Sequence, residues 1–273
     1  MGKLIPAFLL TAVAGLSTGI GSAIAFFAKK TSTKFLSISL GFSAGVMIYV
    51  SMVDIFFKAN ALFVGVYGEK GGMLATVLSF FGGMLIIALI DQVIPKEKNP
   101  HEVKSVEVIC DPETGECRQV ENKSKLMRTG VFTALAIAIH NFPEGLATFI
   151  AALQDFSIAI PIVIAIAIHN IPEGIAVSVP IYYATGSKKK AFFYSFLSGM
   201  SEPVGAVVGY LILLPYMNPV IEGILFAGVA GIMVFISLDE LLPSAREYGE
   251  HHLSIYGLVA GMAVMAVSLL LFM

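Results

Sequence analysis

The sequence predicts an all-α integral membrane protein with eight transmembrane helices. Of its 273 residues, 57% are hydrophobic and only 13% are charged, which is far more apolar than a typical soluble domain. The mean hydropathy is +0.85, and the apolar residues fall in runs of about 18 to 25, the length that a helix needs to cross a bilayer. Because helices satisfy their own backbone hydrogen bonds in lipid, these runs indicate a helical bundle.

Eight apolar runs divide the chain in order. They are expected to span the membrane at 4–28, 35–57, 73–95, 128–153, 158–183, 191–215, 219–244 and 253–273. All the connections between them are short except the third, so consecutive spans are expected to be antiparallel neighbours. Residues 1–273 are therefore interpreted as one transmembrane domain, with 96–127 as its single sizeable loop.

The 96–127 loop is polar, charged and punctuated by Pro and Gly. Within it, DPETGE is typical of a turn that closes a small hairpin over VEVIC and RQVEN. Both cysteines of the chain, Cys110 and Cys117, lie in this loop, and a reducing compartment would keep them from forming a disulfide. Their C-x6-C spacing is poor for zinc even with His101 nearby, so a solvated linker is the better interpretation.

The distribution of Lys and Arg predicts which side of the membrane each loop faces. If the N-terminus lies outside and eight spans alternate, only Lys3, Lys58 and Lys70 of the 17 basic residues face outward. The positive-inside rule therefore places both termini outside the cell, in the extracellular or periplasmic space, and the 96–127 loop in the cytoplasm. The expected location is the cell membrane, in a multi-pass arrangement, with the lipid bilayer as a partner.

A repeated twelve-residue string is the strongest functional signal. AIAIHNFPEGLA at 136–147 and AIAIHNIPEGIA at 165–176 agree at ten positions, and the copies lie 29 residues apart. Each copy places a His, an Asn and a Glu in the middle of an apolar span, where such groups are costly and usually functional. These candidate ligands are His140, Asn141, Glu144, His169, Asn170 and Glu173.

The spacing within the motif suits a metal ion. His and Glu four residues apart share one helix face, so both side chains can reach one ion. Pro143 and Pro172 cannot donate to the helix ladder, which frees the carbonyls of Ile139 and Ile168 near mid-membrane. Imidazole with carboxylate suits a first-row divalent metal such as zinc or iron, and suits calcium poorly. Glu202, in SEPVGA of the sixth span, would supply a further anionic ligand.

Further acidic residues lie at other depths and suggest a path for ions. Asp54 is near the outer end of the second span and Asp91 near the inner end of the third, while Asp239 and Glu240 are near the inner end of the seventh. Acids at these interfaces can equally well face water without any role in transport. A structural His–Glu pair is likewise the alternative for one isolated motif, although the duplication favours a metal site.

These motifs resemble the ZIP (Zrt-, Irt-like) metal transporters, and in particular the bacterial members of that family. The resemblance rests on HNFPEG, HNIPEG and SEPVGA in three consecutive spans and on the long loop after the third span. It implies an eight-helix bundle with inverted repeats and both termini outside the cell, together with import of a divalent metal. It also makes a homodimer a plausible assembly. Unlike many members, this chain has a single His, His101, in the cytoplasmic loop, which puts a metal-collecting role for that loop in doubt.

The resemblance further implies a two-metal centre. Its first site would be formed by His140, Glu144, His169 and Glu173, and its second by Asn141, Glu144, Asn170, Glu173 and Glu202, with both Glu144 and Glu173 bridging. The family's exit acids would correspond to Asp91 and Glu240. The expected cargo is Zn²⁺, with Fe²⁺, Mn²⁺, Co²⁺ and Cd²⁺ as further candidates, because His and Glu ligands accept all of them.

Several function classes are disfavoured by the sequence. No phosphate-binding loop is present that would indicate an ATP-driven pump, and no basic patch indicates nucleic acid as a partner. An intramembrane zinc metalloenzyme is the main alternative, but the acidic residues are spread along the membrane depth and no span offers a separate general base. A passive metal-selective channel is the other alternative. The leading prediction is a transporter, not an enzyme, that imports zinc into the cytoplasm.

Overall fold

Long helices make up nearly all of the part of the chain that the computed structural model describes, which is residues 3–27, 33–93, 108–110, 117–119, 123–247 and 251–271. Two three-residue strands are the exception within those ranges. The α-helices are α1 (Leu4–Phe27), α2 (Thr33–Val50), α3 (Phe56–Val93), α4 (Lys123–Gln154), α5 (Phe156–Thr185), α6 (Lys188–Gly199), α7 (Ser201–Val208), α8 (Pro219–Ile236), α9 (Leu242–Glu247) and α10 (His251–Leu271). An all-helical membrane protein is thus what the composition predicted.

Shorter turns of other helix types extend several of these helices. Three π-helical turns, η1 (Ser51–Ile55), η2 (Gly209–Leu213) and η4 (Ser237–Leu241), follow α2, α7 and α8, and η3 (Leu214–Tyr216) is a short 3₁₀ turn. π-Helical turns are rare and frequently occur at functional sites. Here η1 contains Asp54, and η4 contains Asp239 and Glu240.

By length and composition, six helical stretches of the described residues could cross a membrane. One of them, Ser37–Gln92, has 56 residues, which would be about 84 Å as one helix, against a hydrocarbon core of about 30 Å. Gly68, with a φ of 73°, interrupts its helical geometry. The connection expected between the second and third spans is therefore largely helical, and the sixth expected span is built from α6, α7 and the turns after them.

Local sequence explains where several helices begin and end. Asp155 caps α5, because its carboxylate accepts hydrogen bonds from both the backbone N–H and the hydroxyl of Ser157, and these bonds lower the pKa of Asp155. Gly186 ends α5 in the left-handed region, with a φ of 66°, which glycine adopts without strain. Asn218 caps α8, whose first residue is a proline.

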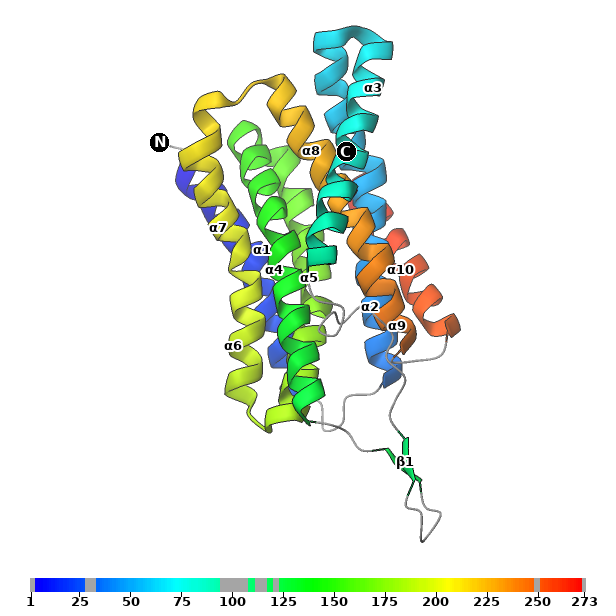
Figure 1. The fold of residues 1–273 in the computed structure, drawn as a ribbon. Coiled ribbons are helices and arrows are strands. Elements are labelled where there is room, and N and C mark those ends of the chain that lie inside the picture. Colours follow the sequence, from blue (N-terminus) through cyan, green and yellow to red (C-terminus); the bar gives the residue numbers. More distant parts are fainter. Residues whose placement is uncertain are drawn as a thin grey trace.

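The helices pack as two groups, which Figure 1 shows side by side. The first helix group consists of α1, α4, α5, α6 and α7, within which α5 packs against α1, α4 and α6. The second helix group consists of α2, α3, α8, α9 and α10, where α3 packs along α8 and α2 along α10. The groups meet where α2 contacts α5 and where α4 contacts α8.

The most buried helices are α4 and α5, at the centre of the bundle. Within their most apolar windows, 69% of α4 and 72% of α5 is buried, against 22% of α10. Large apolar side chains such as Leu78, Leu85 and Leu270 are exposed on the outer helices, as expected where lipid is the solvent. A polar residue on the buried faces of α4 or α5 is therefore surrounded by protein rather than lipid.

The predicted hairpin of the long loop is present. Strands β1 (Val108–Cys110) and β2 (Cys117–Gln119) pair antiparallel, with Cys110 opposite Cys117. The hairpin lies at one end of the bundle, and α1 begins and α10 ends at the opposite end (Figure 1). Most of the 96–127 loop, including His101, lies outside the described residues, and α4 already begins at Lys123, inside the segment expected to be loop.

Candidate metal site

The two copies of the repeated motif meet in the middle of the first helix group. One copy is on α4 and the other on α5, and these helices are neighbours joined through Asp155. Six of the predicted ligand side chains are at most 2% exposed: Asn141, Glu144, His169, Asn170, Glu173 and Glu202. The two motif copies, 29 residues apart in sequence, thus lie on neighbouring helices with these side chains buried.

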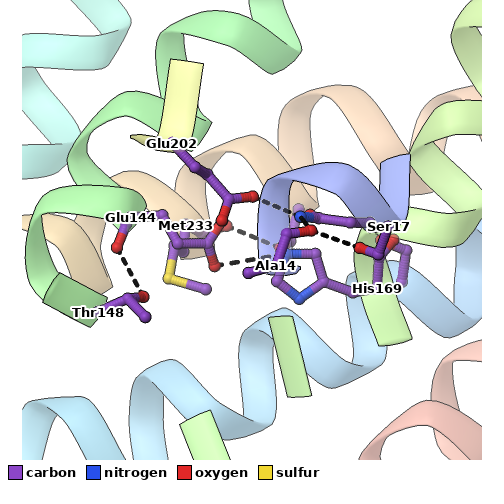
Figure 2. A network of polar contacts seen from close by, with 10 residues as sticks. Ala14, Ser17, Glu144, Thr148, His169, Glu202 and Met233 are labelled. Carbon is purple, nitrogen blue, oxygen red and sulfur yellow. Dashed lines mark hydrogen bonds and ion pairs between the residues drawn. The ribbon is translucent and has the colours of Figure 1, made fainter. Parts of the chain in front are cut away.

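Glu144 and His169 form the direct contact between the two motifs. Glu144 Oε1 lies 3.3 Å from His169 Nε2, and the two side chains are 2% and 0% exposed. Figure 2 shows the Glu144 carboxylate pointing from α4 toward the His169 ring of α5, with Glu202 beside it. An imidazole nitrogen and a carboxylate oxygen are the donor atoms that zinc accepts.

Asn170 connects the motif of α5 to two further helices. Its Nδ2 donates a hydrogen bond to Glu202 Oε1 on α7 and another, of 3.0 Å, to the carbonyl of Ala14 on α1. Both donor contacts use the amide nitrogen, so the amide oxygen Oδ1 is left facing the buried region. This arrangement orients Asn170 as an oxygen donor.

Several buried oxygen atoms of the cluster have no hydrogen-bond donor among the described residues. They are Asn141 Oδ1, Asn170 Oδ1, Glu144 Oε2 and Glu202 Oε2. Leaving one such polar atom buried without a partner costs about 1–3 kcal/mol, and more when it is charged. A cation bound beside such an atom would satisfy it, whereas an apolar filling would not. Carboxylate and amide oxygens next to an imidazole are donor types that suit a divalent metal.

Close helix packing places Glu202 beside α4. A Cβ atom on Gly145, the residue after Glu144, would lie 2.2 Å from the carbonyl oxygen of Glu202. On α5, a Cβ on Gly174 would lie 1.9 Å from the carbonyl oxygen of Thr18. Only glycine allows backbones this close, which explains why both motifs continue from Pro-Glu into Gly.

The prolines of the motifs do not end their helices. Both α4 and α5 continue as helices beyond Pro143 and Pro172. Since proline has no N–H, the carbonyls of Ile139 and Ile168 still lack their usual helical donor. On the neighbouring residue, the carbonyl of His169 accepts a hydrogen bond of 3.3 Å from Ser43 on α2, which ties this level of α5 to the second helix group.

Part of the predicted ligand set lies beyond what the structure describes. The side chain of His140 is outside the described residues. Among the residues described, no three His, Cys, Asp or Glu side chains are gathered as a ready cation-binding group. The structure therefore brings together His169, Glu144, Asn170 and Glu202, while the two-metal centre remains a prediction.

The four predicted path acids lie on α3 and on the π-helical turns η1 and η4. Asp54 forms an ion pair of 2.8 Å with Lys58, one helical turn further along. Asp91 is partly buried near the end of α3, Asp239 is exposed and Glu240 is 6% exposed. Of the four, Asp239 and Glu240 share the π-helical turn η4.

Two buried polar groups were missed by the sequence argument. Glu222 is 5% exposed in the first turn of α8, and the Ser51 hydroxyl is fully buried, with no partner in the described part of the chain. Glu222 lies close to the expected start of a span, where an acid is unremarkable. Ser51 begins the π-helical turn η1 directly after α2, and a lone serine in an apolar run gives no signal from which this burial could have been predicted.

Comparison with known proteins identifies the family. A family model described as "ZIP Zinc transporter" matches residues 92–269. The chain is 66% identical to zinc transporter ZupT of Clostridium perfringens, covering 100% of this chain and 98% of the relative. It is 64% identical to the protein of that name from Streptococcus mutans and 56% identical to that from Chlorobium phaeovibrioides, in both cases over 98% or more of this chain.

A buried cluster of His, Glu and Asn inside a bundle of membrane helices is typical of a functional site in a membrane protein. The chain belongs to the ZIP family. The resemblance drawn from HNFPEG, HNIPEG and SEPVGA is thereby confirmed.

Proposed function

We propose that this protein is a zinc transporter that carries its cargo across the membrane through the cluster on α4, α5 and α7. The observation that carries the proposal is the set of buried oxygens on Glu144, Asn170 and Glu202 beside the His169 imidazole. The relatives that match over their full length are named zinc transporters, which favours zinc over other cargo and a transporter over an enzyme.

In the proposed site, His140, Glu144, His169 and Glu173 hold one ion. Asn141, Asn170 and Glu202, with the two bridging glutamates, hold the second. The described contacts support this division in part: Glu144 meets His169, while Asn170 meets Glu202. Zinc suits nitrogen and carboxylate oxygen ligands, and the absence of thiolate from the set favours binding that is selective yet releasable. Iron, manganese, cobalt and cadmium are proposed as further cargo, because the same ligand types accept them.

The proposed topology has eight spans in the plasma membrane, with both termini outside. Six helical stretches are long enough to span the membrane. Splitting one of them, Ser37–Gln92, at Gly68 gives a seventh span. The helices α6 and α7, with the turns that follow them, give the eighth. Two features support the orientation: α1 begins and α10 ends at the end opposite the β1–β2 hairpin (Figure 1), and the basic residues gather in the segments on the hairpin side.

We further propose import by movement of the first helix group relative to the second. The cation would enter past Asp54, bind at the central cluster and leave past Asp91 and Glu240, with Asp239 exposed at the same end. The contact of α2 with α5 supports this path. The helix α2 lies against a helix of the central cluster and continues into η1, which contains Asp54. A homodimer is the proposed assembly in the bilayer.

Uptake of radioactive zinc into proteoliposomes tests the function. Wild-type protein should show saturable uptake, and His140→Ala or His169→Ala should lose it, because each removes a nitrogen ligand. His252→Ala is the matched control, since His252 is exposed and stacks on Tyr256 away from the cluster. Uptake that never saturates would indicate a passive channel. A well-folded wild type that binds zinc without moving it would refute the transporter.

A further inference from the structure

Glu222 is a buried acid that the proposed transport path does not use. It lies in the first turn of α8 and is only 5% exposed. A carboxylate that is nearly buried requires strong hydrogen-bond partners. Its position in the helix's first turn is favourable, because the backbone N–H groups there carry partial positive charge, but this alone does not explain why the side chain turns into the protein.

The partner of Glu222 comes from the other helix group. Gln154, the last residue of α4, donates a hydrogen bond from Nε2 to Glu222 Oε1. The backbone carbonyl of Gln154 in turn accepts a hydrogen bond of 2.8 Å from Lys3 Nζ, just before α1. One residue therefore connects α1 and α4 of the first helix group to α8 of the second, at the end of the bundle where α1 begins (Figure 1).

Elsewhere along the same interface, the two groups leave a gap between them. An apolar pocket of about 410 Å³, partly open at the surface of the bundle, lies between α4 and the α3–α8 pair and is lined by Ile86, Ile87, Ile90, Phe142, Pro143 and Ile232, among others. It adjoins the motif of α4 at Phe142 and Pro143. Interfaces with such free volume resist sliding less than close-packed ones do. Near the end of α4, by contrast, a directional polar contact fixes α4 against α8.

We propose that Gln154 and Glu222 form a latch that holds the outer ends of the two helix groups together, and that this latch must open in each transport cycle. The inference rests on the proposed movement of the first helix group against the second. A hydrogen bond to a carboxylate constrains both distance and direction, so α4 cannot shift relative to α8 while the bond is intact. Opening it would free the outer end of α4, and the apolar pocket beside α4 would accept the resulting shift.

The test is a reversible cross-link across the latch. Gln154→Cys and Glu222→Cys are combined in a Cys110→Ser, Cys117→Ser background and treated with a short bifunctional methanethiosulfonate, which reductant removes. Zinc uptake into proteoliposomes should fall at least tenfold on cross-linking and return on reduction. Zinc binding to the cross-linked protein should be retained, because the latch contains no proposed ligand.

A second pair provides the matched control. Asn60 and Thr76 are also joined by a side-chain hydrogen bond, of 3.2 Å, but both lie on α3 within the second helix group. The Asn60→Cys, Thr76→Cys pair, cross-linked in the same background, should transport normally. Full uptake by a quantitatively cross-linked latch pair would overturn the proposal, and so would failure of the pair to cross-link. Loss of uptake in the uncross-linked background protein would instead count against the proposed function.

Discussion

Glu144 is the residue on which the central cluster depends most. Its carboxylate reaches His169 across the α4–α5 contact, and its second oxygen has no hydrogen-bond donor among the described residues. In the family pattern it is also one of the two bridging acids. A buried carboxylate in this position is costly unless a cation binds to it, so its presence is best explained by the cargo.

We expect Glu144→Ala to abolish zinc uptake, because the substitution removes a bridging ligand and leaves His169 without its acidic partner. Uptake should fall by at least two orders of magnitude, which corresponds to about 2.8 kcal/mol or more. Proteoliposome uptake measures the effect. Glu69→Ala is the control, since Glu69 is exposed on α3. Normal uptake by Glu144→Ala would refute the proposed site.

Glu202→Ala should behave differently from Glu144→Ala. In the proposed site Glu202 contributes to only one of the two ions, so some transport should remain while the order of preference among zinc, manganese and cadmium changes. Competition of each unlabelled metal against labelled zinc measures this, with Ser201→Ala as the neighbouring control. Complete loss of transport would show that the two sites do not act separately.

At the scale of elements, glycine sets the distance between α4 and α7. Gly145 of α4 leaves room for the backbone of Glu202 on α7. Gly205, the glycine of SEPVGA on α7, in turn leaves room for the backbone of α4, because a Cβ on Gly205 would lie 2.1 Å from the carbonyl oxygen of Phe142. Each helix thus brings a glycine to the other helix's backbone. This reciprocal contact is what positions the Glu202 side chain against a motif on another helix.

Gly145→Ala is expected to push α7 away and weaken zinc binding. The added Cβ meets a backbone oxygen, which cannot rotate aside, so the free energy of unfolding should fall by about 1–3 kcal/mol. Thermal unfolding in detergent and zinc affinity together measure the change. Gly82→Ala on α3 is the matched control, because a Cβ there would have nothing within 4 Å. Equal behaviour of the two variants would contradict the packing argument.

At the scale of the whole molecule, the orientation in the membrane can be read from the native cysteines. Cys110 and Cys117 lie on the β1–β2 hairpin, opposite the end where α1 begins. A membrane-impermeant maleimide should therefore label neither cysteine in intact cells and both after permeabilisation. A Glu69→Cys variant in a cysteine-free background should be labelled from outside. Labelling of the hairpin in intact cells would reverse the proposed topology.

How much of the fold could be predicted from sequence differs between its parts. Several expected spans agree with helices to within about two residues, as 4–28 does with α1 (Leu4–Phe27) and 158–183 with α5 (Phe156–Thr185), because hydrophobic length decides what a bilayer accepts. In contrast, α4 begins at Lys123, five residues before the expected 128. The segment between the second and third spans was wrongly expected to be a short loop. It is helical up to Gly68 and beyond, since nothing in a polar–apolar pattern reveals that a helix continues past the membrane surface.

The sequence by itself determined that this chain is a helical membrane protein with paired His, Asn and Glu side chains at the centre of two neighbouring spans. It could do so because burying such groups in an apolar run is expensive, and the repeat made them visible. Only the tertiary structure decided which helix faces meet. Asn170 forms a hydrogen bond with Glu202, 32 residues further along the sequence, and Gln154 forms one with Glu222, 68 residues further along. Such contacts depend on helix rotation and on glycines that let backbones touch, which no local pattern encodes.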